Sequence, residues 1–276
     1  MTRPKRSLGQ HFLVDAGIQR RIVETLEPEP GDEVLEIGPG RGALTRHLAG
    51  RVRRLVAIEL DDELAAELRR RYADSPGVEI VHADVLETDL ESLVEDVDGL
   101  KVVGNLPYNI TSPVLAWLLE RPVRPAAIVV MVQREVADRI AAGPDGKTYG
   151  ALSVGVQAVA RVERAFTVGR GAFRPVPRVD SAVLRIEPLR PPPIDAETEA
   201  DLRALVRASF RWRRKQLQTI LRRAPGYGLD RDALREIADA TGIDLRRRPE
   251  TLSPAQFIEL ARRLRARGYP THDGGA

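Results

Sequence analysis

The sequence predicts an α/β fold, in which a doubly wound, mostly parallel sheet is followed by a smaller all-α domain. In the first two-thirds of the chain, short apolar runs alternate with helical patterns. Prolines then cluster at Pro188 and at 191–193, and the pattern beyond them is helical only. We therefore predict a domain over residues 1–190, a short linker, and a second domain over 194–276.

Five apolar runs form the parallel part of the predicted sheet, and helix-length segments separate them. The predicted strands cover residues 33–37, 55–58, 78–81, 100–104 and 126–132. Helices are expected over 43–49 and 62–72. The later runs 152–160 and 181–186 are predicted to extend the sheet.

The second domain is predicted to consist of helices. One helix places Leu202, Leu205 and Val206 on one face and Arg203 and Arg207 on another. Further helices are predicted over 216–223, 232–240 and 254–265.

Composition excludes several kinds of site. The 276 residues contain no Cys, which excludes disulfides, a thiolate nucleophile and Cys-ligated zinc or iron–sulfur centres. The four His show no paired metal spacing, and no apolar run reaches the roughly 20 residues of a membrane helix. The basic N-terminus lacks the apolar core of a secretory signal. We expect a cytoplasmic monomer with no metal and no membrane partner.

Charge is distributed unevenly along the chain. Net charge is only +3, but residues 191–276 hold 17 Lys and Arg against 12 Asp and Glu. Eight basic residues and no acidic residue lie between Leu202 and Arg223. This asymmetry indicates a surface that faces a polyanion, although a solvated helix face would show the same pattern.

A glycine-rich loop follows the first predicted strand, in the segment Glu36-Ile37-Gly38-Pro39-Gly40-Arg41-Gly42. Glycines allow the backbone to approach a ligand there. Glu59 ends the second strand, where a carboxylate suits a ribose diol, and Asp84 follows the third, where it can accept from an adenine amine. Ordinary loop residues are the alternative, but the combination predicts a nucleoside cofactor.

NAD and S-adenosylmethionine both fit such a site. The spacing Gly-x-Gly-x-Gly departs from the dinucleotide pattern, and Glu36 could meet a methionine ammonium. These two features favour S-adenosylmethionine, whose product is S-adenosylhomocysteine.

The fourth strand ends in Asn105-Leu106-Pro107-Tyr108. A carboxamide, a proline-stiffened turn and an aromatic ring are the groups that an exposed adenine needs. A strand exit with a capping Asn and a core Tyr is the alternative.

Further motifs accompany these segments along the chain. In order, the set is Gly9-Gln10-His11-Phe12-Leu13, Glu36 to Gly40, Asn105 to Tyr108, Gln133 to Ala137, Lys147 to Val154, Phe173 to Ser181, Arg213 to Leu217 and Arg248 to Ser253. In these motifs and their order, over about residues 7–265, the chain resembles ribosomal RNA adenine N6-dimethyltransferases of the KsgA type. This resemblance implies a Rossmann-like S-adenosylmethionine-dependent methyltransferase domain and a basic RNA-binding domain.

The resemblance also implies cofactor contacts. His11 and Leu13 would close over the cofactor, Gly38 would lie against its methionine part, Glu59 on the ribose and Asp84 on the adenine. The family often has Asn where this chain has His11, and a neutral His can also donate a hydrogen bond.

At the target base, the Asn105 side chain would bridge cofactor and adenine. It and the Leu106 carbonyl would accept hydrogen bonds from the amine, while Pro107 stiffens the turn. Tyr108 would stack on the base and Phe173 would close its other face. For Phe173, a core aromatic before a stiff turn is an equal alternative.

The basic segment would hold the RNA backbone without reading its sequence. The candidate residues are Arg203, Arg207, Arg211, Arg214, Lys215 and Arg222.

The implied activity is dimethylation of two adjacent adenines in a hairpin loop near the 3′ end of small-subunit ribosomal RNA, with a role in subunit biogenesis. The implied partner is the immature small subunit. A sister enzyme that methylates one large-subunit adenine and confers macrolide resistance is a rival, but the blocks 147–154 and 248–253 favour the small-subunit branch. An assembly factor whose methyl transfer is dispensable and an NAD-dependent enzyme are further alternatives.

Overall fold

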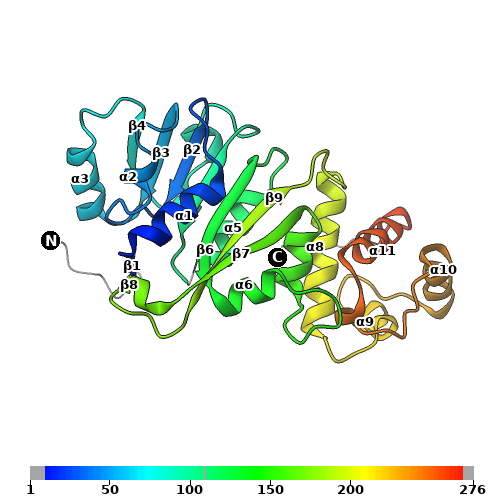
Figure 1. Ribbon diagram of the computed structural model, residues 1–276. Helices are drawn as coiled ribbons and strands as arrows, with labels where there is room; N and C mark the ends of the chain where they lie inside the picture. Colours follow the sequence, from blue (N-terminus) through cyan, green and yellow to red (C-terminus); the bar gives the residue numbers. More distant parts are fainter. Residues whose placement is uncertain (1–9, 109, 270–276) are drawn as a thin grey trace. The chain divides into compact units, whose positions relative to one another are not determined.

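The computed structural model describes residues 10–108 and 110–269, which form two compact units (Figure 1). The first unit comprises residues up to Ala137 together with Arg161–Pro188, and the second comprises Asp138–Ala160 and the chain from Leu189 onward. The predicted domain ranges, 1–190 and 194–276, differ from these units mainly in residues 138–160. Those residues pack with the helical unit.

The first unit is built on a seven-stranded sheet with the order β4-β3-β2-β5-β6-β9-β7. The strands are β2 (Glu33–Ile37), β3 (Arg54–Glu59), β4 (Val78–His82), β5 (Lys101–Asn105), β6 (Ala127–Gln133), β7 (Ala160–Val168) and β9 (Ser181–Pro188). The strands from β4 to β6 pair in parallel, whereas β9 pairs antiparallel to β6. The predicted mostly parallel, doubly wound sheet is therefore confirmed.

A second, two-stranded sheet joins the start of the described chain to a distant loop. β1 (Phe12–Leu13) pairs antiparallel to β8 (Phe173–Arg174), with Phe12 opposite Arg174 and Leu13 opposite Phe173. The sequence did not predict these strands, because each has only two residues.

Helix α1 (Ala16–Leu26) lies between β1 and β2, and the other helices of the first unit lie between strands of the large sheet. These are α2 (Thr45–Leu48), α3 (Asp62–Arg71), α4 (Leu90–Leu93), α5 (Thr111–Leu119) and α6 (Arg134–Ile140), with 3₁₀ turns η2 (Val85–Glu87) and η3 (Arg170–Ala172). α6 continues into the second unit. Aspartates cap the starts of α1 and α3, where Asp15 and Asp61 each accept two backbone N–H bonds.

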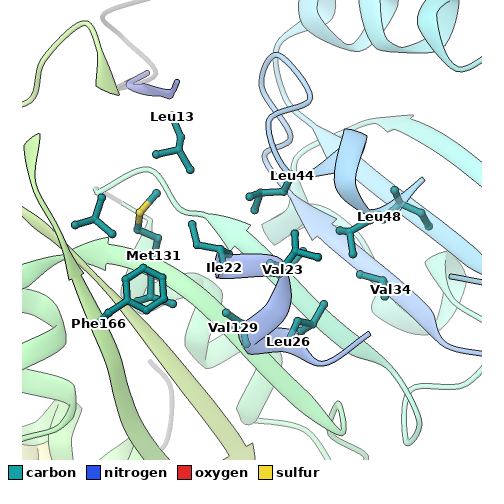
Figure 2. Packing of buried hydrophobic residues seen from close by; sticks show 14 of the residues in the cluster. Leu13, Ile22, Val23, Leu26, Val34, Leu44, Leu48, Val129, Met131 and Phe166 are labelled. Carbon is teal, nitrogen blue, oxygen red and sulfur yellow. The ribbon is translucent and has the colours of Figure 1, made fainter. Parts of the chain in front are cut away.

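The core of the first unit lies around α1. Its residues Ile22, Val23 and Leu26 are fully buried and belong to one cluster with side chains from the sheet and from α2. Figure 2 shows these three side chains between Leu48 and Phe166, which lie on opposite sides of α1 in that view. Burial of large aliphatic side chains contributes roughly 1.5–3 kcal/mol each, so this cluster anchors the strands whose ends carry the site.

The strand predicted over 152–160 is wrong. Residues Ala151–Gln157 form helix α7, and the strand β7 begins only at Ala160. The alternating valines are typical of a strand, but Ser153 caps the helix start by accepting from the Gly150 N–H at 3.0 Å. Val154 and Val156 are then buried in the helical unit, where tertiary packing outweighs β-propensity.

The second unit consists of helices packed mainly around α8 and α11. They are α7, α8 (Ala196–Arg211), α9 (Leu217–Arg223), α10 (Arg231–Thr241) and α11 (Pro254–Ala266), with the 3₁₀ turn η4 (Pro249–Thr251). The predicted apolar face of α8 is confirmed, because Leu202, Leu205 and Val206 are buried. Within the described residues, no helix is both long and apolar enough to cross a bilayer.

Candidate active site

A cavity of about 280 Å³ opens at the carboxyl ends of the parallel strands of the first unit. It lies where the strand order reverses between β2 and β5, the usual ligand position in open α/β sheets. The cavity is lined by nine predicted site residues, namely His11, Leu13, Gly38, Glu59, Asp84, Asn105, Leu106, Pro107 and Tyr108. The structure therefore brings together side chains that are up to 97 positions apart in the sequence.

The glycine loop turns sharply after β2. Gly38, Gly40 and Gly42 have φ values of +66°, +58° and +77°, which disfavour any residue with a Cβ. The Gly38 N–H donates to the Ile58 carbonyl at 2.9 Å, which ties the loop to β3. A Cβ built on Gly38 would meet nothing within 4 Å, so open space lies against its backbone.

Glu59 is held at the end of β3 by two backbone donors. Its Oε2 accepts from the Gly40 N–H and its Oε1 from the Asp61 N–H, each at 2.9 Å. Burial raises the pKa of the Glu59 carboxyl, while these N–H donors act in the opposite direction. A carboxylate oxygen has two lone pairs, so each can accept one more hydrogen bond, as a ribose diol requires.

Glu36 lies one strand away, at the end of β2, and is only 1% exposed. Its Oε2 accepts from the Thr45 hydroxyl at 2.7 Å. Burial raises the pKa of Glu36 to about 7, the Thr45 hydrogen bonds lower it, and the charge of Glu59 raises it further. Among the residues that the structure describes, no cation pairs with the Glu36 carboxyl, which lines the cavity. A buried, unpaired carboxylate is costly to form, so a cationic ligand would stabilise its ionised state.

Asp84 follows β4 and caps the short turn η2, where it accepts from the Leu86 N–H at 2.9 Å. Asp84 lines the cavity next to Val85, which is buried. This arrangement offers an acceptor beside an apolar wall, as an adenine ring with an exocyclic amine requires.

The Asn105–Tyr108 segment leaves β5 at the cavity. The Asn105 Nδ2 donates to the His11 carbonyl at 3.1 Å, which leaves Oδ1 as the acceptor of this side chain. Leu106 is anchored by its N–H, which donates to the Met131 carbonyl at 3.1 Å. Among the described residues no hydrogen bond reaches the Leu106 carbonyl, whereas the Pro107 carbonyl accepts from the Ile110 N–H at 3.2 Å.

Tyr108 presents a half-buried ring to the cavity. Its hydroxyl lies 3.3 Å from the Ser181 Oγ, and burial raises the pKa of the phenol. The ring is stacked with that of His11, with centroids 5.8 Å apart and an angle of 27° between the planes.

Phe173 does not line the cavity. Its side chain is 0% exposed and belongs to the core cluster around α1, beneath the pairing of β1 with β8. The structure thus matches the core interpretation of this residue, because Leu13 lies opposite it across the two strands. Its role as the second face of a bound base stays a prediction that requires β1 to move.

The predicted RNA-binding residues all belong to the second unit. Arg207, Arg211, Arg214, Lys215 and Arg222 are exposed, whereas Arg203 is partly buried and pairs with Glu199 at 2.7 Å. Arg203 therefore has its charge neutralised within α8, and it is the weakest of the six candidates for a phosphate contact.

Sequence reasoning missed several lining residues near the N-terminus of the described chain. Gln10 donates to Asp61 at 3.0 Å, and the Phe12 ring lies against Gly40 beneath the Arg41 guanidinium, 4.5 Å from the ring centroid. Their position next to His11 in one motif was the available signal. Within the described residues, no group of three His, Asp or Glu side chains could hold a metal ion.

The cavity fits S-adenosylmethionine by the chemistry of its groups. Glu36 offers a buried carboxyl to an ammonium, Glu59 an acceptor pair to a diol, and Asp84 an acceptor to an adenine amine. The open space against Gly38 leaves room for the ligand at the glycine loop.

Comparison with known proteins identifies the relatives of this chain. The family model for ribosomal RNA adenine dimethylase matches residues 1–264. Ribosomal RNA small subunit methyltransferase A of Geobacter metallireducens is 46% identical over 268 residues, which cover 96% of this chain and 97% of the relative. The protein of the same name from Pseudomonas aeruginosa is 41% identical over 262 residues, covering 95% of each chain.

Two solved structures resemble this one over nearly the whole chain. A dimethyladenosine transferase from Plasmodium falciparum has a TM-score of 0.77, 23% identity and coverage of 94% of this chain and 99% of that one, a likeness that shows the fold. The 23S rRNA methyltransferase ErmE has a TM-score of 0.69 and 31% identity, covering 92% of this chain and 99% of that one.

Proposed function

Because this chain belongs to the ribosomal RNA adenine dimethylase family, we propose that it transfers methyl groups from S-adenosylmethionine to N6 of two adjacent adenines in small-subunit ribosomal RNA. The relatives named for the small subunit are 41% and 46% identical, against 31% for the 23S enzyme ErmE. This order of identity favours the small-subunit substrate.

The position of Asn105 and Tyr108 at one cavity with Glu36, Glu59 and Asp84 carries the proposal. The acidic groups suit the cofactor, and the carboxamide and the aromatic ring suit an extruded adenine. With a nicotinamide cofactor, the segment Asn105 to Tyr108 would have no adenine to bind.

The chain's own residues mainly position the acceptor. S-adenosylmethionine, when bound, supplies an electrophilic methyl group on a sulfonium. The Asn105 Oδ1 and the Leu106 carbonyl accept from the two N–H groups of the amine, which favours a nitrogen lone pair that is available for attack. Tyr108 supports the ring by stacking, worth about 1–3 kcal/mol per base.

No side chain is assigned as general base, because the proton on the alkylated nitrogen can leave to water. The second transfer needs a cavity that accepts an amine already carrying one methyl group. In that step the amine has one N–H left, so only one of the two acceptors can be used.

The exposed basic residues of the second unit would hold the RNA backbone, and the immature small subunit is the proposed partner. The protein is proposed to act as a monomer.

Mapping of methylation on both ribosomal subunits tests the proposal. Purified protein and S-adenosylmethionine are incubated with small and large subunits from cells that lack the gene, at several stages of assembly. We expect N6,N6-dimethyladenine at two adjacent small-subunit positions. Transfer to a large-subunit adenine alone would assign the chain to the macrolide-resistance branch, and no transfer to any RNA adenine would refute the proposal.

A further inference from the structure

Residues 10–13 contact several of the loops that line the cavity. Gln10 donates to Asp61 beyond β3, the His11 carbonyl accepts from Asn105 at the end of β5, and Phe12 lies against Gly40. These contacts and the pairing of β1 with β8 fix the backbone of the segment on both sides of His11.

The His11 ring occupies one face of Tyr108. The ring centroids are 5.8 Å apart, and the planes are within 27° of parallel. The His11 Nδ1, at the edge of the ring, lies 2.8 Å from the Pro175 carbonyl oxygen, and this hydrogen bond helps to hold the ring over Tyr108. Both rings line the cavity.

The spacing of the two rings excludes a base between them. Stacked bases are separated by about 3.4 Å, so a base between two rings needs them about 7 Å apart. The observed 5.8 Å is too short. Because the backbone is fixed, rotation of the His11 side chain is the smallest change that frees Tyr108. Among the described residues, the one hydrogen bond of this side chain that the rotation breaks is that to the Pro175 carbonyl.

We propose that His11 takes the position of the target base on Tyr108 in the free protein and that an unpaired purine must displace it to be methylated. This inference rests on the proposed function. His11 is then a specificity-determining residue. A base can displace the His11 ring from Tyr108 only if the rest of the bound RNA holds that base at the cavity. The apparent affinity for RNA is then the intrinsic affinity multiplied by the fraction of free protein in which Tyr108 is not covered by His11.

Steady-state kinetics of His11→Ala and His11→Asn test the proposal, with the KM for small-subunit RNA and the KM for the cofactor measured separately. Both variants lack a ring, and both keep the backbone carbonyl that holds Asn105. We expect each to lower the KM for RNA about threefold to tenfold. His11→Asn can still donate to Pro175, so equal effects of the two variants would assign the competition to the ring.

Two controls make the result specific. His82→Ala removes an exposed histidine outside the cavity wall, whose Nε2 lies 3.2 Å from the Leu60 carbonyl, and should keep the wild-type KM. In a Tyr108→Leu background, His11→Ala should no longer lower the KM for RNA, because the ring has nothing to cover.

Three results would overturn the inference. A higher KM for RNA in both His11 variants would show that His11 contributes to binding of the base. An unchanged KM would show that the stacking of His11 on Tyr108 has no effect on RNA binding. If the wild-type protein methylates no RNA adenine, the proposed function fails and this inference fails with it. Methylation by the wild type combined with either KM result refutes the inference alone.

Discussion

The cavity of the first unit and the basic surface of the second unit hold their polar groups in opposite ways. The basic surface is here the set of exposed candidate residues Arg207, Arg211, Arg214, Lys215 and Arg222. In the cavity, Glu36 and Glu59 are 1% and 7% exposed, and each accepts a defined hydrogen bond from the protein. On the second unit, Arg207, Arg214 and Lys215 are exposed. Methyl transfer needs atoms placed to a fraction of an ångström, whereas phosphate binding needs only charge at a suitable distance.

This difference predicts two kinds of mutational response. Changes in the cavity should alter the rate of transfer or the cofactor affinity, with little dependence on salt. Changes on the basic surface should alter RNA affinity in a salt-dependent way and leave the chemistry intact.

Asn105→Ala should have the largest effect. It removes the acceptor that holds the amine and the donor to the His11 carbonyl. We expect kcat to fall about 10²- to 10³-fold, as for the loss of one positioned polar group at a reacting centre. Single-turnover transfer to small-subunit RNA at saturating cofactor measures this.

Asn105→Asp is the matched variant, because it keeps an oxygen acceptor and loses the Nδ2 donor. It should lose less activity than Asn105→Ala if acceptance from the amine is the main task. An Asn105→Ala enzyme that keeps more than half of the wild-type kcat would contradict the assigned role.

Cofactor affinity should depend on pH through Glu36, whose pKa is raised to about 7 by burial. A cationic ligand favours the ionised carboxyl, so binding releases a proton near neutral pH. Because the ionised fraction is about one-tenth at pH 6 and nine-tenths at pH 8, affinity should rise about tenfold between them. Calorimetry in buffers with different ionisation enthalpies measures both the affinity and the proton release.

Glu36→Gln is the control, and it should remove most of the pH dependence of cofactor affinity while lowering that affinity at pH 8.

The raised pKa of Glu36 also predicts how the stability of the folded protein changes with pH. The folded protein keeps a proton that the unfolded chain loses above its ordinary pKa of 4.5, so the free energy of unfolding should fall as pH rises from about 4.5 to 7. Chemical denaturation of Glu36→Gln should show a smaller fall over that range.

The cavity could be predicted closely from the sequence because its residues follow strands in a fold with simple rules. Glu59 and Asp84 come directly after apolar runs, and parallel strands bring their ends to one edge. The resemblance added His11 and Leu13, which strand rules alone do not place at this edge.

Other features could not be predicted, because long-range packing decides them. The segment 152–160 alternates like a strand, yet Ser153 and the burial of Val154 make it a helix. Phe173 lies in a functional motif, yet the two-residue strands β1 and β8 cover it. The stacking of His11 on Tyr108 joins residues 97 positions apart, and no local pattern encodes it.

The smallest effect is expected on the basic surface, from Arg214→Ala combined with Lys215→Ala. Both side chains are exposed in the turn between α8 and α9, so their loss should remove phosphate contacts without disturbing the fold. RNA affinity should fall about threefold to tenfold at moderate salt. The slope of log affinity against log salt should become shallower by about 1.5, the change expected for the loss of two phosphate contacts.

The control is Arg231→Ala with Arg235→Ala, which removes the same charge from exposed positions on α10 and should leave the slope nearly unchanged. Equal slopes for the two double variants would mean that the basic surface acts only through net charge, and the contrast between a preorganised cavity and a phosphate-binding surface would then rest on the cavity alone.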